Sequence, residues 1–193
     1  MSTKYRPSFK EESKSICSQV RQELGLTMTQ RLDPWLLARH LDITVVPLGY
    51  IERFAPYGCH HFLHENQSAF SAVTVFRGAE RIIVHNDAHT VGRQASDITH
   101  EIAHGLLMHT PLPALDGRGC RYWDPVIERE AEWLAGVLLV PEQAVLLIVR
   151  RGWFVGTAAN YFSVSERLIE WRLNVTGAYV RVERETRKYA SIH

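Results

Sequence analysis

Residues 95–109 read ASDITHEIAHGLLMH, and this stretch decides how the rest of the chain is interpreted. Ile98 and Ile102 recur with other apolar residues at intervals of three and four, which is the period of an amphipathic helix. His100 and His104 enclose the pattern HExxH within this helix. Four residues along an α-helix give a net rotation of about 40°, so both imidazoles project from one face. Such a pair supplies two of the ligands of a tetrahedral zinc ion.

The glutamate inside the pattern points to catalysis. Glu101 lies about 100° around the helix from His100, too far to join the histidine pair but close enough to reach a water on the metal. We therefore predict that Glu101 acts as the general base. Two histidines on a helix can also be ordinary surface hydrogen-bonding groups, but Glu101 would then be a coincidence.

A catalytic zinc site needs a third protein ligand. A histidine six residues after His104 is excluded because that position holds Thr110. His109 is predicted to lie about 140° around the helix from His104 and to point elsewhere. The third ligand must therefore come from another part of the chain.

Residues 124–141 read DPVIEREAEWLAGVLLVP, and the Asp-Pro start predicts a second helix. Glu128 and Glu132 share a helical stripe with alanines, which permit close approach to the HExxH helix, whereas Glu130 lies on a different side. We favour Glu128 as the third ligand and Glu132 as the acceptor for the free N–H of a ligand histidine. The reversed assignment, with Glu132 on the metal, remains open, as does a merely solvated acidic face.

The two helices together resemble a known family. HEIAHGLLMH at 100–109 and EREAEWLAGVLLVP at 128–141 are similar to the paired helix motifs of the ImmA/IrrE family of bacterial metallopeptidases. The chain departs from the family pattern at Glu132, where Asn or Asp is usual. The resemblance extends over roughly residues 10–178. It implies a gluzincin-like core, a cytoplasmic bacterial setting and cleavage of a protein substrate, often a transcriptional repressor.

The expected chemistry follows from the ligand set. Zn²⁺ on two histidines and a glutamate would activate a water and polarise the scissile carbonyl, while Glu101 moves the proton to the leaving amine. Candidates for an oxyanion donor are His109, Arg121 and Tyr122. The alternative function is a metal-binding regulatory or DNA-binding protein that uses a peptidase-like fold without proteolysis.

We predict an α+β fold. Strands are expected at 43–48, 68–76 and 81–85, with a hairpin turn at 77–80. They would form a small antiparallel three-stranded sheet, packed on the HExxH helix and the following Glu-bearing helix. The last strand is expected to be an edge along which an extended peptide pairs.

Two parts are expected in the chain. Residues 1–141 would form the zincin-like peptidase core, and residues 142–193 a helical, helix-turn-helix-like segment packed on it. Three short helices are expected between 142 and 176. The excess of Arg and Lys over Glu there makes DNA binding conceivable, but the many apolar residues favour a packing role.

The composition limits the partners and the cellular compartment that we expect for this protein. The 193 residues are 46% hydrophobic and carry a net charge of +1, which provides no global field for nucleic acid or anionic lipid. Cys17, Cys59 and Cys120 are widely spaced and odd in number, so a disulfide framework is not expected. With no secretory or membrane-spanning segment in the sequence, a cytoplasmic protein without a membrane partner is expected.

A second group of histidines occurs in the stretch CHHFLHEN, at His60, His61 and His64. Pro56 and Asn66 bracket this stretch, so helical i, i+4 geometry is doubtful there. Surface or core hydrogen bonding is the favoured role, and metal binding is the alternative.

Overall fold

The computed structural model describes residues 5–110 and 124–190, and it has the α+β fold predicted from the sequence. The first half contains α1 (Phe9–Glu23), α2 (Pro34–His40), β1 (Thr44–Pro47), α3 (Leu48–Glu52), α4 (Pro56–His60), the π-helix η1 (His61–Glu65), the 3-10 helix η2 (Gln67–Ala69), β2 (Ala72–Arg77) and β3 (Glu80–His85). The second half contains α5 (Val91–Leu106), α6 (Pro125–Leu139), α7 (Glu142–Arg150), α8 (Val155–Phe162), α9 (Glu166–Thr176) and α10 (Ala178–Ala190).

The three strands form a mixed sheet in the order β1-β3-β2. β2 and β3 are an antiparallel hairpin, and Arg77 pairs with Glu80 at the predicted turn. β1 runs parallel to β3, so the prediction of an all-antiparallel sheet is wrong. The reason is the connection: β1 ends and β2 begins opposite His85, because the helical segment between them returns to the same end of the sheet. β3 is therefore central, and β2 takes the edge position that had been assigned to the last strand.

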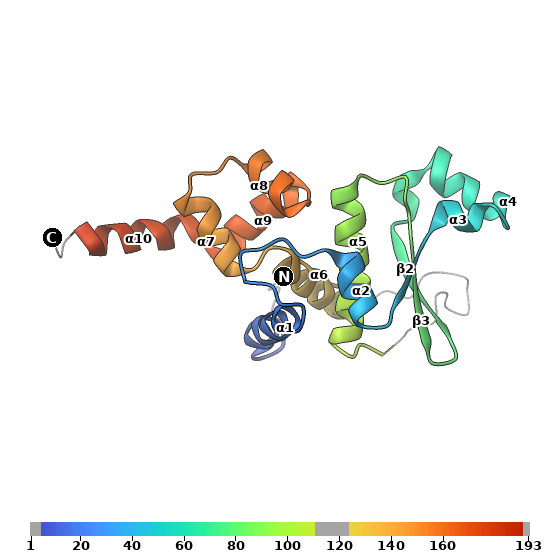
Figure 1. Cartoon of the computed structure of the whole chain (residues 1–193), viewed down its shortest axis with the longest axis horizontal. Coiled ribbons are helices and arrows are strands. Elements are labelled where there is room, and N and C mark those ends of the chain that lie inside the picture. The colour runs from blue at the N-terminus through green and yellow to red at the C-terminus, as the bar shows by residue number, and fades with distance from the viewer. Residues whose placement is uncertain (1–4, 111–123, 191–193) are drawn as a thin grey trace.

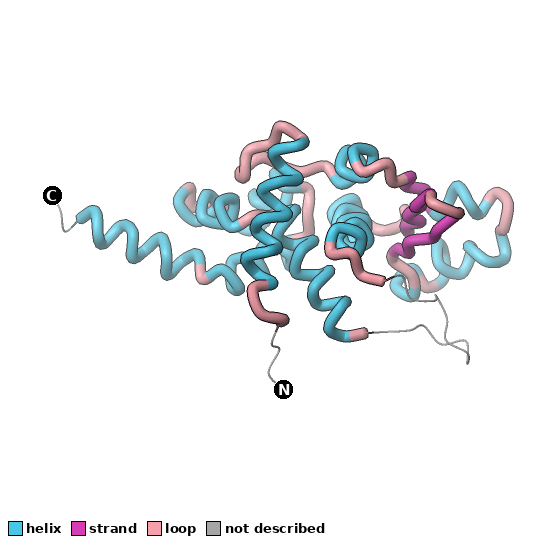
Figure 2. Tube along the Cα trace, turned by 90° about the horizontal axis from the view of Figure 1, so that it is seen from below, coloured by secondary structure: helices cyan, strands magenta, loops and turns pink. Residues whose placement is uncertain are grey.

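The sheet lies between two unequal apolar clusters. Neighbouring residues of a strand face opposite sides, and accordingly Ile83 of β3 joins the main core while Val84 packs against a small cluster of Leu48, Cys59 and Leu63. Figure 1 shows α5 on one side of the strands and α3 with α4 on the other. Figure 2 shows the strands gathered at one end of the molecule.

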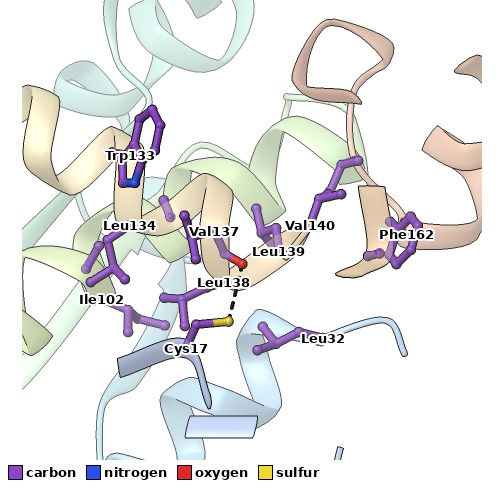
Figure 3. Close-up of a cluster of buried hydrophobic side chains, with 14 of the residues drawn as sticks. Cys17, Leu32, Ile102, Trp133, Leu134, Val137, Leu138, Leu139, Val140 and Phe162 are labelled. Atoms are coloured by element: carbon purple, nitrogen blue, oxygen red, sulfur yellow. Dashed lines mark hydrogen bonds between the residues drawn. The ribbon is translucent and has the colours of Figure 1, made fainter. Parts of the chain in front are cut away.

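The main core is built around α6, whose residues from Glu130 to Leu139 are buried with the exception of Glu132 (Figure 3). Leu134 and Leu138 are fully buried, and the Cys17 thiol of α1 donates to the Val137 carbonyl at 3.4 Å. Cys17 and Cys59 are free thiols, while Cys120 lies outside the described residues. No disulfide joins the two described cysteines.

Asp-Pro pairs start two helices, and the pair at Asp124 was predicted from the sequence. The Asp33 carboxylate accepts from the backbone N–H groups of Trp35 and Leu36, and a proline follows at the first helical position. The Asp124 carboxylate does the same for Val126 and Ile127. These bonds satisfy amide groups that have no partner inside the helix.

Two buried arginines donate hydrogen bonds to carbonyls at the C-terminal end of α6. Arg21 of α1 donates to the Leu138 carbonyl at 2.8 Å, and Arg172 of α9 donates to the Val140 carbonyl at 2.9 Å. The last carbonyls of a helix lack partners within it and carry its negative dipole end, so cationic donors are favourable there. Burial lowers the pKa of Arg172 to about 10, which leaves it charged at neutral pH.

The C-terminal segment contains the three short helices expected between 142 and 176. Ile169 and Leu173 of α9 belong to the main core, and Trp171 meets Trp133 of α6 edge to face at 5.7 Å between ring centroids. α10 was not predicted, and it extends away from the body (Figure 1). The division of the chain at residue 141 stays a prediction.

Among the described helices, none alone has the length and apolar character to cross a bilayer. Only α6 and α7 taken together meet those criteria, and they are bent by 52° where they meet.

Candidate metal centre

His100 and His104 lie one turn apart on α5, as the HExxH spacing predicts. Their Nε2 atoms are 3.0 Å apart, and their ring centroids are separated by 4.7 Å. Ile98 and Ile102 of the same helix are fully buried in the main core. The amphipathic pattern thus fixes which face of α5 is buried, and the histidines occupy a face that is only partly covered.

Glu128 of α6 meets both histidines. Its Oε2 lies 3.1 Å from His100 Nε2 and 3.8 Å from His104 Nε2. Burial alone would raise the pKa of Glu128, but hydrogen bonding to His100 and His104 outweighs this and holds the pKa far below its usual value. The carboxylate is therefore ionised and faces two imidazoles, which is the donor set that a divalent cation requires.

The spacing of the three donors fits a zinc-sized ion. The three ligand atoms lie within 4.8 Å of one another, with separations of 3.0, 3.1 and 3.8 Å. Ligands about 2.0–2.1 Å from a tetrahedral ion are about 3.3 Å apart. Ala103 of α5 and Ala131 of α6 are both fully buried, and such small residues let the two helices approach closely enough for this geometry.

Glu101 is held beside this group by the sheet. Its side chain is 8% exposed, and its Oε2 accepts from the Thr74 hydroxyl of β2 at 2.6 Å. No local pattern in the sequence singles out Thr74. It lies 27 residues before Glu101, and only the pairing of β2 with β3 brings it there.

An open cleft of about 600 Å³ runs past these groups. Its walls come from three helices and from Ser71 and Ala72 at the start of β2. α5 contributes His100 and Glu101, α6 contributes Glu128 and Glu132, and α9 contributes Leu168 and Trp171. The C-terminal segment thus forms one wall of the cleft that contains the candidate metal ligands.

Glu132 lies on the cleft wall and is exposed. Within the described residues it makes no hydrogen bond to either His100 or His104. Its expected role toward a ligand histidine therefore stays a prediction.

His109 also contacts one of the candidate ligand histidines. Its Nδ1 lies 3.0 Å from His104 Nδ1, so one of the two nitrogens donates to the other. The prediction that His109 points away is wrong, because α5 ends at Leu106 and Met108 adopts a left-handed φ of 52° that turns the chain back. Burial and the nearby His104 lower the pKa of His109.

His109 also contacts a buried carboxylate through its other ring nitrogen. His109 Nε2 lies 3.5 Å from Glu130 Oε2, which also accepts from Arg6 Nε at 3.1 Å. Glu130 is 4% exposed. The other two oxyanion candidates, Arg121 and Tyr122, lie outside the described residues.

A second donor group lies on the far side of the sheet from α5. Glu52, His60 and His64 also place one ligand atom each within 4.8 Å of the others. The segment Pro56–Glu65 is helical throughout, as α4 and η1, so the doubt about its geometry is removed. Among the residues that the structure describes, the buried glutamates are Glu101 and Glu130, and neither belongs to this second group.

The family comparison agrees with the sequence resemblance. The family described as Peptidase M78, IrrE N-terminal-like domain, matches residues 60–174, more than half of the chain. No curated protein and no solved structure matches the chain significantly. The matched residues include both α5 and α6, which carry the candidate ligands. The chain therefore belongs to the M78 peptidase family.

Proposed function

We propose that this protein is a zinc-dependent endopeptidase that cleaves a protein substrate. The observation that carries the proposal is the position of Glu101, a nearly buried carboxylate that lines the same cleft as His100 and Glu128, two of the three residues whose ligand atoms converge. A metal ion that only stabilises a fold has no use for such a group, because no water has to be deprotonated beside it.

His100, His104 and Glu128 would hold the ion. Two imidazoles and one carboxylate form a set that zinc commonly takes in hydrolases. A zinc ion there would polarise the scissile carbonyl and would lower the pKa of its bound water to about 7. The contact from His109 to His104 would fix the orientation of that ring.

Glu101 would act as the proton carrier. Thr74 donates to one carboxylate oxygen of Glu101, which restricts the rotation of the group and leaves the second oxygen for a water. From this position Glu101 would remove a proton from the attacking water and deliver it to the leaving amine.

The substrate would bind as an extended peptide along β2. β2 is an edge strand, and within the described residues no strand pairs with its outer side. Ser71 and Ala72, at its start, line the cleft. Main-chain pairing with an edge strand supplies affinity without fixing side chains, so the cleft wall of α9 would contribute selectivity.

The resemblance to ImmA/IrrE peptidases supports a cytoplasmic bacterial protein that acts on a transcriptional repressor. DNA binding by the C-terminal helices is the alternative partner assignment. The burial of Ile169, Arg172 and Leu173 in the core and the use of Trp171 in the cleft wall favour the packing role for α9. We therefore retain the protein substrate as the proposed partner.

The test compares wild-type protein with Glu101→Gln after reconstitution with zinc. Both are incubated with the repressor encoded by a neighbouring gene and with a mixed peptide library, and products are identified by mass spectrometry. Glu101→Gln should keep its zinc and lose at least ~10²-fold in rate, because general base catalysis contributes about that much.

Glu80→Gln is the matched control, because Glu80 is an exposed residue of the β2–β3 turn. It should cleave at the wild-type rate. Wild-type turnover by Glu101→Gln would remove Glu101 from the mechanism, and zinc-loaded wild type that cuts nothing would count against the peptidase assignment.

A further inference from the structure

Glu52, His60 and His64 converge on one point outside the cleft. Glu52 Oε1 lies 3.5 Å from His60 Nδ1 and 3.2 Å from His64 Nε2, and the two imidazole centroids are 4.6 Å apart. Both separations from Glu52 are close to the distance of about 3.3 Å between ligands of a tetrahedral zinc ion. One carboxylate oxygen is thus shared between two imidazoles that present different nitrogens.

The surroundings suit a hydrated ion. His60 and His64 are exposed, and Glu52 is half-buried. The remaining coordination positions would be open to water, which avoids the cost of burying a charge. Cys59 is adjacent in sequence but is buried in the small apolar cluster, and the convergent ligand atoms come from Glu52, His60 and His64 instead.

The helices that carry these residues pack around a small apolar cluster. Their apolar cluster contains the buried side chains of Leu48, Cys59 and Leu63, whereas the main core gathers most of the buried apolar residues. A cluster this small contributes little stabilisation on its own. A cross-link between α3 and the α4–η1 segment would therefore add substantially to local order.

We propose that Glu52, His60 and His64 form a second metal site, which binds a divalent ion of the zinc class and ties α3 to the α4–η1 segment. This site is structural and does not depend on the proposed peptidase activity. Its segment is anchored next to the cleft: Asn86 donates to the carbonyls of Phe62 and Phe70, and Ser71 and Ala72 follow directly into the cleft wall.

The experiment counts bound ions in variants of the full chain. His100→Ala/His104→Ala removes the candidate centre on α5, and Zn²⁺ titration by calorimetry should then find one bound ion. Further replacement of His60 and His64 by Ala should reduce this to none. Wild-type protein should bind two ions, and Co²⁺ in place of Zn²⁺ should show a visible spectrum from each site.

His61→Ala is the matched control, because His61 lies in the same segment and is exposed but pairs with Glu65 instead. It should bind as many ions as wild type. Hydrogen exchange provides a second readout: Zn²⁺ should protect residues 48–65 in His100→Ala/His104→Ala, and this protection should vanish when His60 and His64 are also replaced.

Two outcomes would overturn the proposal. One is that His100→Ala/His104→Ala binds no Zn²⁺ although circular dichroism shows it to be folded. The other is that an ion remains bound, with residues 48–65 protected, after His60 and His64 are replaced.

Discussion

At the scale of single residues, Thr74 is the most direct support for Glu101. Thr74→Val removes a hydrogen bond to a carboxylate while keeping the shape of the side chain. Hydrogen bonds to charged groups contribute about 1.5–3 kcal/mol, so kcat should fall by roughly ten- to a hundredfold. Zinc content should not change, and Thr74→Ser should recover most of the rate. A wild-type kcat for Thr74→Val would show that the contact does not position the base.

His109 provides a second prediction at this scale. It contacts His104 Nδ1, on the side of the ring away from Glu128. Loss of a group that orients a metal-ligating histidine typically weakens metal affinity by about 10–100-fold. His109→Ala should show this loss in competition with a zinc chelator.

Glu132→Gln is the informative comparison for His109→Ala. Sequence analysis gave the orienting role to Glu132, but the structure places it on the cleft wall. Unchanged zinc affinity is expected for this variant. A weaker affinity for Glu132→Gln than for His109→Ala would support Glu132 as the orienting group, as predicted from the sequence.

At the scale of elements, the start of α5 lies close to the turn between α8 and α9. A Cβ added at Gly92 would lie 2.8 Å from the Val164 carbonyl carbon and 3.1 Å from the Ser165 nitrogen, both backbone atoms. Gly92→Ala should therefore destabilise the fold by about 1–3 kcal/mol, even though alanine favours a helix by up to ~1 kcal/mol. Denaturant unfolding measures this change.

Gly105→Ala is the comparison within the same helix. Its added Cβ would meet the guanidinium end of Arg81, a flexible side chain that can move away. Its unfolding free energy should stay near that of wild type. Equal losses in both variants would mean that close packing of α5 against the α8–α9 turn is not what Gly92 provides.

What could be predicted from sequence also depends on the element. The helical period fixed the positions of His100 and His104, and the alanine stripe of α6 favoured Glu128, because both inferences use only the local geometry of a helix. The place of β3 in the sheet could not be predicted in this way. It depends on where the long connection between β1 and β2 returns, which no local pattern encodes.

The same distinction explains the residues that were missed. His109 was misplaced because one left-handed residue, Met108, ends the helical geometry before it. Thr74 contacts Glu101, which lies 27 residues later in the sequence. Glu52 contacts His64, which lies 12 residues later. Such contacts arise only when the whole chain has folded.

At the scale of the whole molecule, the main core crosses the predicted boundary at residue 141. Phe162 and Ile169 lie after this boundary and are buried in the same cluster as Leu138. A chain ending at residue 141 should therefore lack a cooperative thermal transition and should bind hydrophobic dyes. If this fragment unfolds as sharply as the full chain, residues 1–141 form an independent domain.

The hydrogen bonds of Arg21 and Arg172 to the end of α6 affect the candidate metal centre. These side chains come from near opposite ends of the chain and meet at the last turn of the helix whose first turn presents Glu128. The C-terminal end of α6 is therefore held in position by one side chain from α1 and one from α9. Loss of either arginine would therefore shift α6 and misalign the Glu128 carboxylate, although neither arginine contacts that carboxylate.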